Sequence, residues 1–151
     1  MKGPLGKGLG LSCLSKGTHV AFAAGTGVLV FIDIVAKLLL QQQSLLKDED
    51  KFNEDFKFVF YVSFMSRDEA IGLELMEGLH NLLRESGSDA FDLRLRLSKD
   101  PKQLAKPPRW DEAFVREQLN DLGKLEKLWV CGPPMMNEQF EDITQKLDAE
   151  G

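Results

Sequence analysis

The chain has few cysteines and few histidines, which limits the chemistry that it can hold. The two cysteines, Cys13 and Cys131, lie far apart in the sequence, and the two histidines are His19 and His80. Two distant cysteines do not make a disulfide framework, and these four residues lack the spacing of metal ligands. We expect no metal site and a reducing, cytoplasmic compartment. If the parent protein is associated with a membrane, we expect this domain to face the cytosol.

The chain also lacks an excess or a cluster of positive charge. It has 19 lysine and arginine residues against 24 aspartate and glutamate residues, which gives a formal net charge of -5 at pH 7. Nucleic-acid-binding proteins concentrate lysine and arginine on one face, where these side chains meet the phosphate backbone. We therefore expect no nucleic-acid partner.

A long uninterrupted hydrophobic run is missing as well. The main apolar stretch, residues 20–40, contains Gly25, Gly27, Asp33 and Lys37. A glycine-rich turn and charges inside a membrane span are difficult to accommodate in lipid, and no signal peptide precedes the stretch. A transmembrane helix is therefore the disfavoured alternative here, and we expect no membrane span in this chain.

What the sequence does contain is an alternation of short apolar runs and longer segments with helical period. At 151 residues, the chain is long enough for one domain with a real core. The alternation is typical of a parallel sheet that is covered by helices. The predicted strands are residues 19–24, 56–62, 91–97 and 127–131. The first three predicted helices are residues 28–46, a helix that starts at Ser66 and stops at Gly87, and residues 112–122. A fourth helix follows the last strand, and its apolar stripe is Met136, Phe140, Ile143 and Leu147.

Local signals set the ends of the two middle helices. Ser66 and Glu69 have the spacing of a capping box, in which a side chain at the helix start bonds a backbone amide three residues later. Asp111 is suited to cap the next helix, and Gly123 is suited to end it. The apolar stripe expected for the earlier of the two helices is Ile71, Leu75, Met76, Leu79 and Leu83.

The strand sequences also predict a spatial order. Residues 56–62 are almost entirely apolar, as in a central strand, whereas residues 91–97 alternate strictly, as in an edge strand. This favours an α/β fold, a doubly wound, Rossmann-like parallel sheet with strand order 3-2-1-4 between two helical layers (three-layer α/β/α). Residues 128–130 would then lie on the other edge, where no fifth strand follows in the sequence to cover them. We expect the chain to be a fragment of a larger protein.

Two turns rich in glycine and proline follow the first and fourth predicted strands. The glycine turn, residues 23–28 (AAGTGV), leads into a helix whose free N–H groups favour an anion such as a phosphate. The proline turn, residues 131–134 (CGPP), starts the last helix. Because the two strands are expected to be neighbours, both turns should face one crevice at the carboxyl end of the sheet. Taken singly, each turn is also explained as an ordinary tight turn.

Four segments together resemble the nicotinamide-nucleotide domain of the ferredoxin reductase family, which includes cytochrome and nitrate reductases. They are residues 3–6 (GPLG), 23–28 (AAGTGV), 62–70 (VSFMSRDEA) and 129–136 (WVCGPPMM). The resemblance covers nearly the whole chain, and the cysteine-glycine-proline-proline match is its most specific part. It implies that residues 18–151 form an NAD(P)-binding domain. It also implies that residues 1–17 are a linker from a flavin-binding domain that is absent from this chain.

The resemblance also assigns roles to individual residues. Cys131 would lie beside the nicotinamide and orient it, which makes Cys131 the catalytic candidate. The residues implied in pyrophosphate binding are Gly25, Thr26 and Gly27, and those implied near the adenosine ribose are Ser63, Phe64 and Arg67. The residues implied in the nicotinamide pocket are Cys131, Gly132, Pro133 and Met135. An arginine at position 67 would suit the 2′-phosphate of NADP, but Arg67 also reads as a solvated first-turn residue, so NADH and NADPH both stay open.

The chain departs from the pattern of the family at three places. Ala24 stands where relatives have a second glycine, and Leu29 and Val30 stand where they have a threonine and a proline near the flavin. The last two substitutions put efficient hydride transfer in doubt. The family's flavin signature needs a tyrosine, whereas the single tyrosine here, Tyr61, lies inside a predicted strand. The resemblance therefore places FAD in the absent domain.

The function that we expect is that of an NAD(P)H-binding module in a flavin-dependent oxidoreductase. It would position the nicotinamide for hydride transfer to FAD. We expect it to act as an enzyme only when it is joined to its flavin-binding domain. A Rossmann-like interaction module that has lost its cofactor is the alternative that Leu29 and Val30 support. An S-adenosylmethionine-dependent methyltransferase is disfavoured, because residues 21–24 (AFAA) lack the usual acidic residue. The electron acceptor stays open.

Overall fold

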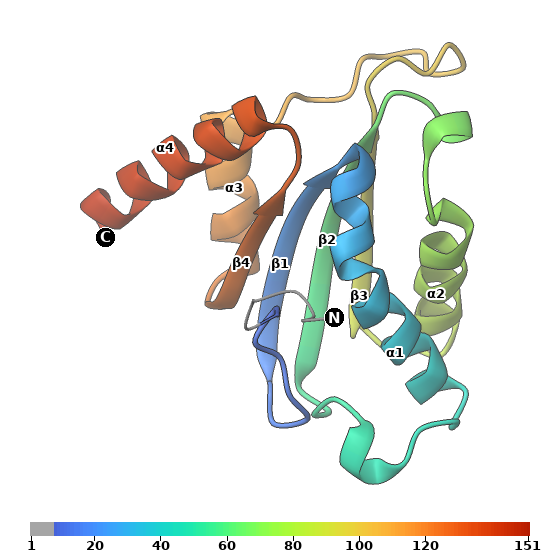
Figure 1. Ribbon diagram of the computed structural model, residues 1–151. Helices are drawn as coiled ribbons and strands as arrows, with labels where there is room; N and C mark the ends of the chain where they lie inside the picture. Colours follow the sequence, from blue (N-terminus) through green and yellow to red (C-terminus); the bar gives the residue numbers. More distant parts are fainter. Residues whose placement is uncertain (1–7) are drawn as a thin grey trace, which may run out of the picture.

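The computed structural model describes residues 8–151, which form a parallel sheet with helices on both faces (Figure 1). The strands are β1 (Gly17–Ala24), β2 (Phe56–Phe64), β3 (Phe91–Leu97) and β4 (Leu125–Cys131), in the order β3-β2-β1-β4. Helices α1 (Ile32–Gln42) and α2 (Leu73–Glu85) cover one face, and α3 (Glu112–Leu122) and α4 (Pro134–Glu150) cover the other. The predicted fold class and strand order are confirmed.

The strand environments follow from the sequence patterns. Eight of the nine residues of β2 are buried, the exception being Lys57, and β2 pairs with β1 on one side and β3 on the other. In β3 the polar residues Asp92, Arg94 and Arg96 alternate with apolar ones, and only Phe91 and Leu97 are fully buried. The sheet therefore has its most apolar strand inside and its alternating strand at the edge, as predicted.

Two hydrophobic clusters fill the space on either side of the sheet. On the α1–α2 face the core includes Phe58 and Phe60 of β2, Phe31, Val35 and Met76. On the α3–α4 face the core is smaller. Its buried members are Val20, Phe22, Val59, Tyr61, Val115, Phe140 and Ile143. The two clusters account for the three-layer arrangement, because each helix buries one apolar side against the sheet.

The predicted bounds of the first helix, residues 28–46, are wrong at both ends. Helical turns already begin at Gly25, as a 3-10 helix over Gly25–Phe31, because the left-handed Gly25 (φ 55) turns the chain at once after β1. The α-helical part ends at Gln42. Ser44 follows in the left-handed region (φ 57), which stops the helix before residue 46.

The predicted start of the second helix is also wrong. The side chain of Ser66 makes no capping bond, and Arg67–Glu69 form a separate 3-10 turn. The helix starts at Leu73, after a left-handed Gly72 (φ 72). A Cβ atom added to Gly72 would lie 2.8 Å from the Cδ1 atom of Ile32, so α1 packs closely against the turn that precedes α2.

The change of start also changes which side chains α2 buries. Ile71 lies outside the helix and is 42% exposed, and Leu73 is buried instead. Leu75 is only partly buried, whereas Met76, Leu79 and Leu83 lie in the core as predicted. The predicted stop is confirmed, because α2 ends at Glu85 just before the left-handed Gly87 (φ 76).

The predicted ends of α3 are confirmed. The Oδ1 atom of Asp111 accepts a hydrogen bond from the Phe114 amide at 2.9 Å, which is the N-cap geometry. Gly123 ends the helix with a positive φ of 71°. In α4, Phe140 and Ile143 are buried and Met136 and Leu147 pack against them, so the predicted stripe is confirmed as well.

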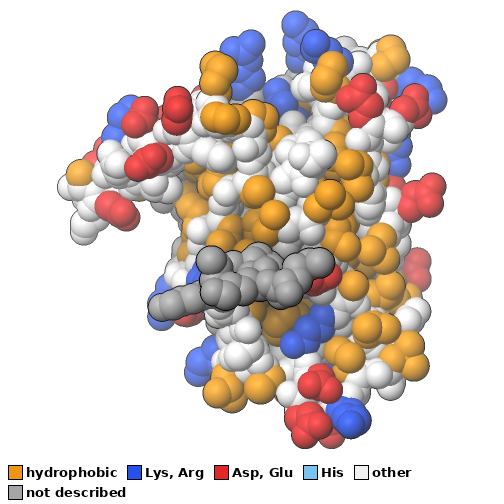
Figure 2. All heavy atoms as spheres, in the orientation of Figure 1, with side chains coloured by type: hydrophobic (Ala, Val, Ile, Leu, Met, Phe, Trp, Pro, Cys, Tyr) orange, Lys and Arg blue, Asp and Glu red, His pale blue; other side chains and the backbone are white. Residues whose placement is uncertain are grey.

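The described residues contain one helical stretch, Gly25–Gln42, that is long and apolar enough to cross a membrane by length and composition alone. Only 28% of this stretch is buried inside the fold. Its buried side chains, Val28, Phe31, Ile34, Val35 and Leu38, belong to the core beneath the sheet. Within the same stretch, Leu29, Val30 and Leu40 are exposed. Figure 2 shows hydrophobic side chains spread over this face of the molecule.

The part of the predicted linker that the structure describes lies against the domain. The Nζ atom of Lys127 in β4 donates hydrogen bonds to the carbonyl oxygens of Leu9 (3.2 Å) and Gly10 (2.6 Å), and Leu11 packs against the core. The GPLG segment, residues 3–6, lies outside the described residues. The assignment of residues 1–17 as an interdomain linker stays a prediction.

Candidate functional site

The glycine turn and the proline turn contact each other at the carboxyl end of the sheet. β1 pairs with β4, and Ala23 lies opposite Cys131 at the end of this pairing. A Cβ atom added to Gly27 would overlap the backbone of Cys131 and lie 3.2 Å from its Sγ atom. Only a glycine fits at position 27. The two turns therefore pack directly against each other at this point.

A second contact joins the same two turns. A Cβ atom at Gly132 would lie 2.6 Å from the Sδ atom of Met136 and 3.4 Å from the Cβ atom of Ala24. The side-chain amide of Asn137 donates a hydrogen bond to the carbonyl oxygen of Gly132 at 3.2 Å, which fixes the turn to the first part of α4. Ala24 therefore lies directly beside the proline turn.

The outer surface of the glycine turn is open. Gly25 and Thr26 are exposed, and a Cβ atom on Gly25 would meet no other atom within 4 Å. In the proline turn, Cys131 and Gly132 are half-buried, and Pro133 and Met135 are exposed, Met135 by 82%. These two turns hold seven of the residues that the sequence resemblance implies in cofactor binding. The structure brings all seven to one end of the sheet, namely Gly25, Thr26, Gly27, Cys131, Gly132, Pro133 and Met135.

A cavity of about 430 Å³ lies beside the two turns, on the α3–α4 side of the sheet. We call it the arginine cavity, because two arginine side chains line it. Its lining includes Ala24, Ser63, Arg96, Arg109, Trp110 and Pro133. A cavity of this size is within the range of volumes found for small-molecule sites.

Arg96 is held in place by two hydrogen bonds. Its Nη1 atom donates to the hydroxyl of Ser63 at 3.0 Å, and its Nε atom donates to the carbonyl oxygen of Pro108 at 2.9 Å. Burial, and then the neighbouring positive charge of Arg109, lower the pKa of Arg96 below its usual value. The two guanidinium groups therefore repel each other in the cavity. Asp111 also lines the cavity, but its Oδ1 atom caps α3.

Trp110 gives the arginine cavity an aromatic wall. Its ring lies edge-on to Phe22, at a centroid distance of 5.2 Å, and edge-on to Phe140 at 6.4 Å. These contacts with the smaller core hold the ring in one position. An aromatic ring fixed in this way offers a surface on which a planar base can stack.

Two of the residues implied near the adenosine ribose lie away from this cavity. Ser63 lines the cavity, but its neighbour in the strand, Phe64, points to the opposite face and is buried in the α1–α2 core. Arg67 is exposed, and its Nη2 atom donates to both carboxylate oxygens of Glu77, at 2.9 Å and 2.7 Å. The structure therefore places Ser63 with the turns and leaves Phe64 and Arg67 apart from them.

The sequence reasoning missed Arg96 and Arg109, which are the two positively charged residues in the lining of the arginine cavity. A signal for Arg96 was present, because the alternation of residues 91–97 puts its side chain on the polar face of the strand. The pairing of Ser63 with Arg96 in the β2–β3 register places this side chain at the carboxyl end of the sheet. No pattern in the sequence marks Arg109, which reaches the cavity from the loop before α3.

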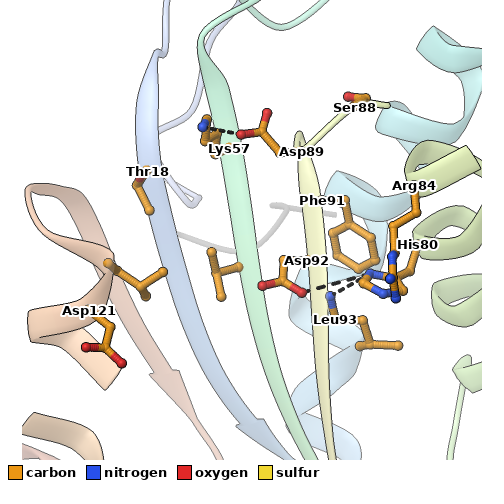
Figure 3. Close-up of a pocket in the computed structure, with 12 residues that line it drawn as sticks. Thr18, Lys57, His80, Arg84, Ser88, Asp89, Phe91, Asp92, Leu93 and Asp121 are labelled. Atoms are coloured by element: carbon orange, nitrogen blue, oxygen red, sulfur yellow. Dashed lines mark hydrogen bonds and ion pairs between the residues drawn. The ribbon is translucent and has the colours of Figure 1, made fainter. Parts of the chain in front are cut away.

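A larger cavity of about 620 Å³ lies near the other end of β2 and β3 (Figure 3). Two of its charged residues, Lys57 and Asp89, form an ion pair with each other. A third, Asp92, pairs with Arg94, which lies outside the cavity lining. The Nδ1 atom of His80 accepts a hydrogen bond from the backbone amide of Leu93 at 3.2 Å. The cavity lies away from the two turns.

Comparisons with known proteins give matches by structure alone. No family model and no curated protein sequence matches the chain. The CS-b5R domains of human Ncb5or in the NAD+ form are similar with a TM-score of 0.63 and 21% identity, over 87% of this chain and 34% of that one. The cytochrome b5 reductase domain of Ulva prolifera nitrate reductase gives a TM-score of 0.57 and 12% identity, over 86% and 47% of the two chains.

Ferredoxin-NADP+ reductase from Plasmodium falciparum with 2′P-AMP gives a TM-score of 0.58 and 18% identity, over 85% of this chain and 48% of that chain. The chain thus spans about a third to a half of the length of these structures. The class of fold is therefore the α/β nucleotide-binding fold of reductases. More particularly, it is the fold of the NAD(P)-binding domain of ferredoxin and cytochrome b5 reductases, as the sequence resemblance predicted.

Proposed function

We propose that the chain binds NAD(P)H across the glycine and proline turns and presents the nicotinamide to FAD, which a separate domain of the same parent protein holds. The observation that carries the proposal is the direct contact of Gly27 with Cys131. This contact brings the residues implied for the pyrophosphate and for the nicotinamide to one surface, next to the arginine cavity. Bound NAD(P)H supplies the hydride, and the chain holds the nicotinamide in position.

Each part of the surface suits one part of the dinucleotide. The open backbone at Gly25 and Thr26 suits the pyrophosphate, because an anion gains from free N–H groups at the start of a helical segment. The arginine cavity suits the adenosine portion, with the ring of Trp110 as a wall for the base. The remaining part of the surface, at Cys131 and Gly132, suits the nicotinamide.

Cys131 acts in this proposal as a positioning group and not as a nucleophile. Its backbone is fixed by β1 on one side and by Gly27 on the other, so its partly buried thiol is held beside Gly27 and against the edge of the α1–α2 core. A fixed thiol there orients the nicotinamide and excludes water, while hydride transfer requires a separation of about 3–3.5 Å between the reacting atoms.

The proposal includes a flavin-binding domain as partner. Leu29 and Val30 are 53% and 49% exposed directly after the glycine turn. Apolar side chains beside a cofactor surface suit contact with a second domain, which would also keep water away from the transferred hydride. The cytoplasmic location stays part of the same proposal, since it follows from the cysteine usage alone.

The proposal is tested by titrating the chain with NADH and with NADPH while amide chemical shifts are recorded by NMR. We expect the amide signals of Gly25, Gly27 and Gly132 to move first, because these residues form the surface on which the ligand would lie. Gly78, an exposed glycine of α2 with no atom near its Cα hydrogens, serves as the control and should not move. An unchanged spectrum at millimolar nucleotide would contradict the proposal.

An interaction module without a cofactor is the second candidate, and the exposed Leu29 and Val30 favour it. The same titration separates the candidates, because an interaction module would respond to neither nucleotide. A response to S-adenosylmethionine alone would instead support the methyltransferase alternative.

A further inference from the structure

The outer edge of β3 carries backbone groups that face away from the sheet. The amide of Phe58 donates a hydrogen bond to the carbonyl oxygen of Ala90 at 2.8 Å, and the amide of Ser98 donates to the carbonyl oxygen of Phe64 at 2.9 Å. In a parallel pair, alternate residues of a strand bond to the same neighbour. The even-numbered residues of β3 therefore bond to β2. The residues whose backbone groups point outward are Phe91, Leu93, Leu95 and Leu97.

Among the described residues, only one of these outward groups has a hydrogen-bond partner. The amide of Leu93 donates to the Nδ1 atom of His80 in α2 at 3.2 Å (Figure 3), and the outward groups of Phe91, Leu95 and Leu97 bond to none of residues 8–151. The first half of this edge borders open space, because the cavity of about 620 Å³ is lined by Phe91, Leu93 and His80. An open strand edge is a template for pairing with another strand.

We propose that this edge binds β3 of a second copy of the chain, antiparallel and centred on Arg94, so that two molecules form one continuous sheet. The inference is independent of the proposed function. The strand sequence, FDLRLRL, is complementary to itself in this arrangement. Phe91 lies opposite Leu97 of the second copy, and Leu93 lies opposite Leu95. Asp92 lies opposite Arg96, and the two-fold symmetry repeats this pair of opposite charges.

The backbone groups fit the same register. In an antiparallel pair, opposite residues alternate between hydrogen-bonded and non-hydrogen-bonded pairs. With Arg94 at the centre, odd-numbered residues lie opposite odd-numbered residues, so the outward groups of one strand meet the outward groups of the other. Asp92 and Arg96 then occupy non-hydrogen-bonded positions, where opposite side chains lie closer together. The register therefore suits the backbone and the charges at once.

The one like-charged pair of this register, Arg94 with itself, is already compensated within each molecule. The Nε atom of Arg94 donates to the Oδ2 atom of Asp92 at 3.0 Å, and its Nη1 atom donates to the Tyr61 hydroxyl at 2.6 Å and to the Oε1 atom of Gln118 at 2.8 Å. These bonds direct the guanidinium toward β2 and α3, away from the outer edge. The Oδ1 atom of Asp92 and the Nη2 atom of Arg96 form no hydrogen bond within the described residues.

His80 restrains the pairing, because its Nδ1 atom occupies the Leu93 amide that the second strand would use. Both copies of His80 must turn away before the two strands can pair along their whole length. Removal of this imidazole should therefore strengthen the association, whereas removal of an ordinary interface side chain weakens it.

The test measures the dimer dissociation constant by sedimentation equilibrium for the unmodified chain and its variants. We expect the unmodified chain to dimerise reversibly. H80A should dimerise about five-fold more tightly, since its dimer forms without the loss of two hydrogen bonds. D92R places an arginine opposite Arg96 and should dimerise about ten-fold more weakly. E138R makes the same change of charge at an exposed residue of α4, and it should dimerise like the unmodified chain.

The double variant D92R/R96D tests the register, because it restores opposite charges across the two-fold axis. It should dimerise more tightly than D92R, and circular dichroism checks that each variant is folded. The inference is overturned if the unmodified chain and H80A both stay monomeric at the highest concentration reached. Equal dimerisation of D92R and E138R would overturn it too, because the copies would then associate through another surface.

Discussion

At the scale of the single residue, the site depends on Gly27, where two turns from distant parts of the sequence meet. Residues 27 and 131 are brought together by the parallel pairing of β1 and β4. The contact between them tolerates no side chain. Gly25, two residues earlier, is needed for a different reason: its left-handed backbone (φ 55) turns the chain out of β1.

Replacing Gly27 by alanine should therefore destabilise the fold by about 1–3 kcal/mol, the usual cost of forcing an extra methyl group into a packed position. Urea unfolding followed by circular dichroism measures this difference. The matched control is G78A in α2, where an added Cβ atom meets nothing within 4 Å. G78A should stabilise the helix by about 0.5–1 kcal/mol. An unchanged unfolding midpoint in G27A would mean that the turns are not in contact in solution.

A comparison of Arg96 and Arg109 with Arg67 shows that the charge of a single residue does not by itself identify a binding residue. Arg67 lies in the segment that resembles the family's ribose-binding region, yet Glu77 neutralises it. Arg96 reads in the sequence as one of several polar residues of an edge strand. Its distinction comes from Ser63 on the neighbouring strand and from Arg109 on a loop.

At the scale of the element, the two helices of the α1–α2 face end and begin at left-handed residues. α1 stops at Ser44 (φ 57), and α2 starts after Gly72 (φ 72). A serine in this region is strained because its Cβ atom crowds the backbone, whereas glycine is not. The sequence alone does not show that Ser44 has this conformation, since serine is not a usual marker of a helix end.

S44G should therefore stabilise the protein by about 0.5–1 kcal/mol, because it relieves the strain of a left-handed side chain at an exposed position. Thermal and urea unfolding provide the measurement. Gln43→Gly is the control: residue 43 has an ordinary negative φ (-83), so glycine there should only lower stability. If both variants lowered stability equally, the helix would not end as described.

At the scale of the whole molecule, the stability of the fold depends on pH through His19. This side chain is 2% exposed in the middle layer of the molecule, where its ring packs against Phe56 (4.7 Å between centroids) and Trp129 (5.7 Å). Burial is the main cause that lowers the pKa of His19 below 6.5, and the hydrogen bond to the carbonyl oxygen of Gly17 opposes it. The folded protein therefore favours neutral His19.

We expect the free energy of unfolding to fall as the pH is lowered below about 6.5, because the unfolded chain then binds a proton at His19 that the folded chain binds only at lower pH. The loss ends once the pH is below the folded pKa, where both states are protonated. Urea unfolding between pH 8 and pH 5 measures this slope. In H19Q, which cannot titrate, the slope in this window should be smaller, and an equal slope in both proteins would assign the pH dependence to other groups.

Much of the fold could be predicted from periodicity alone, because hydrophobic patterning reflects which face of each element is buried. The unbroken apolar run of β2, the alternation of β3, and the Asp111 and Gly123 signals of α3 all led to correct elements and to the correct strand order. Both ends of α1 and the start of α2 were predicted wrongly. The start of α2 lies at the left-handed Gly72, which packs against Ile32, and α1 ends before the left-handed Ser44, a residue type that does not usually mark a helix end.

The sequence by itself determined the class of fold and the two turns, since apolar period and glycine and proline spacing act locally along the chain. Only the tertiary structure decided that Gly27 touches Cys131, that Arg67 is paired with Glu77, and that Arg96 and Arg109 share a cavity. The physical reason is that pairing and repulsion of charges depend on distance in space. Strand pairing, and the loop that carries Arg109, set these distances across many residues of sequence.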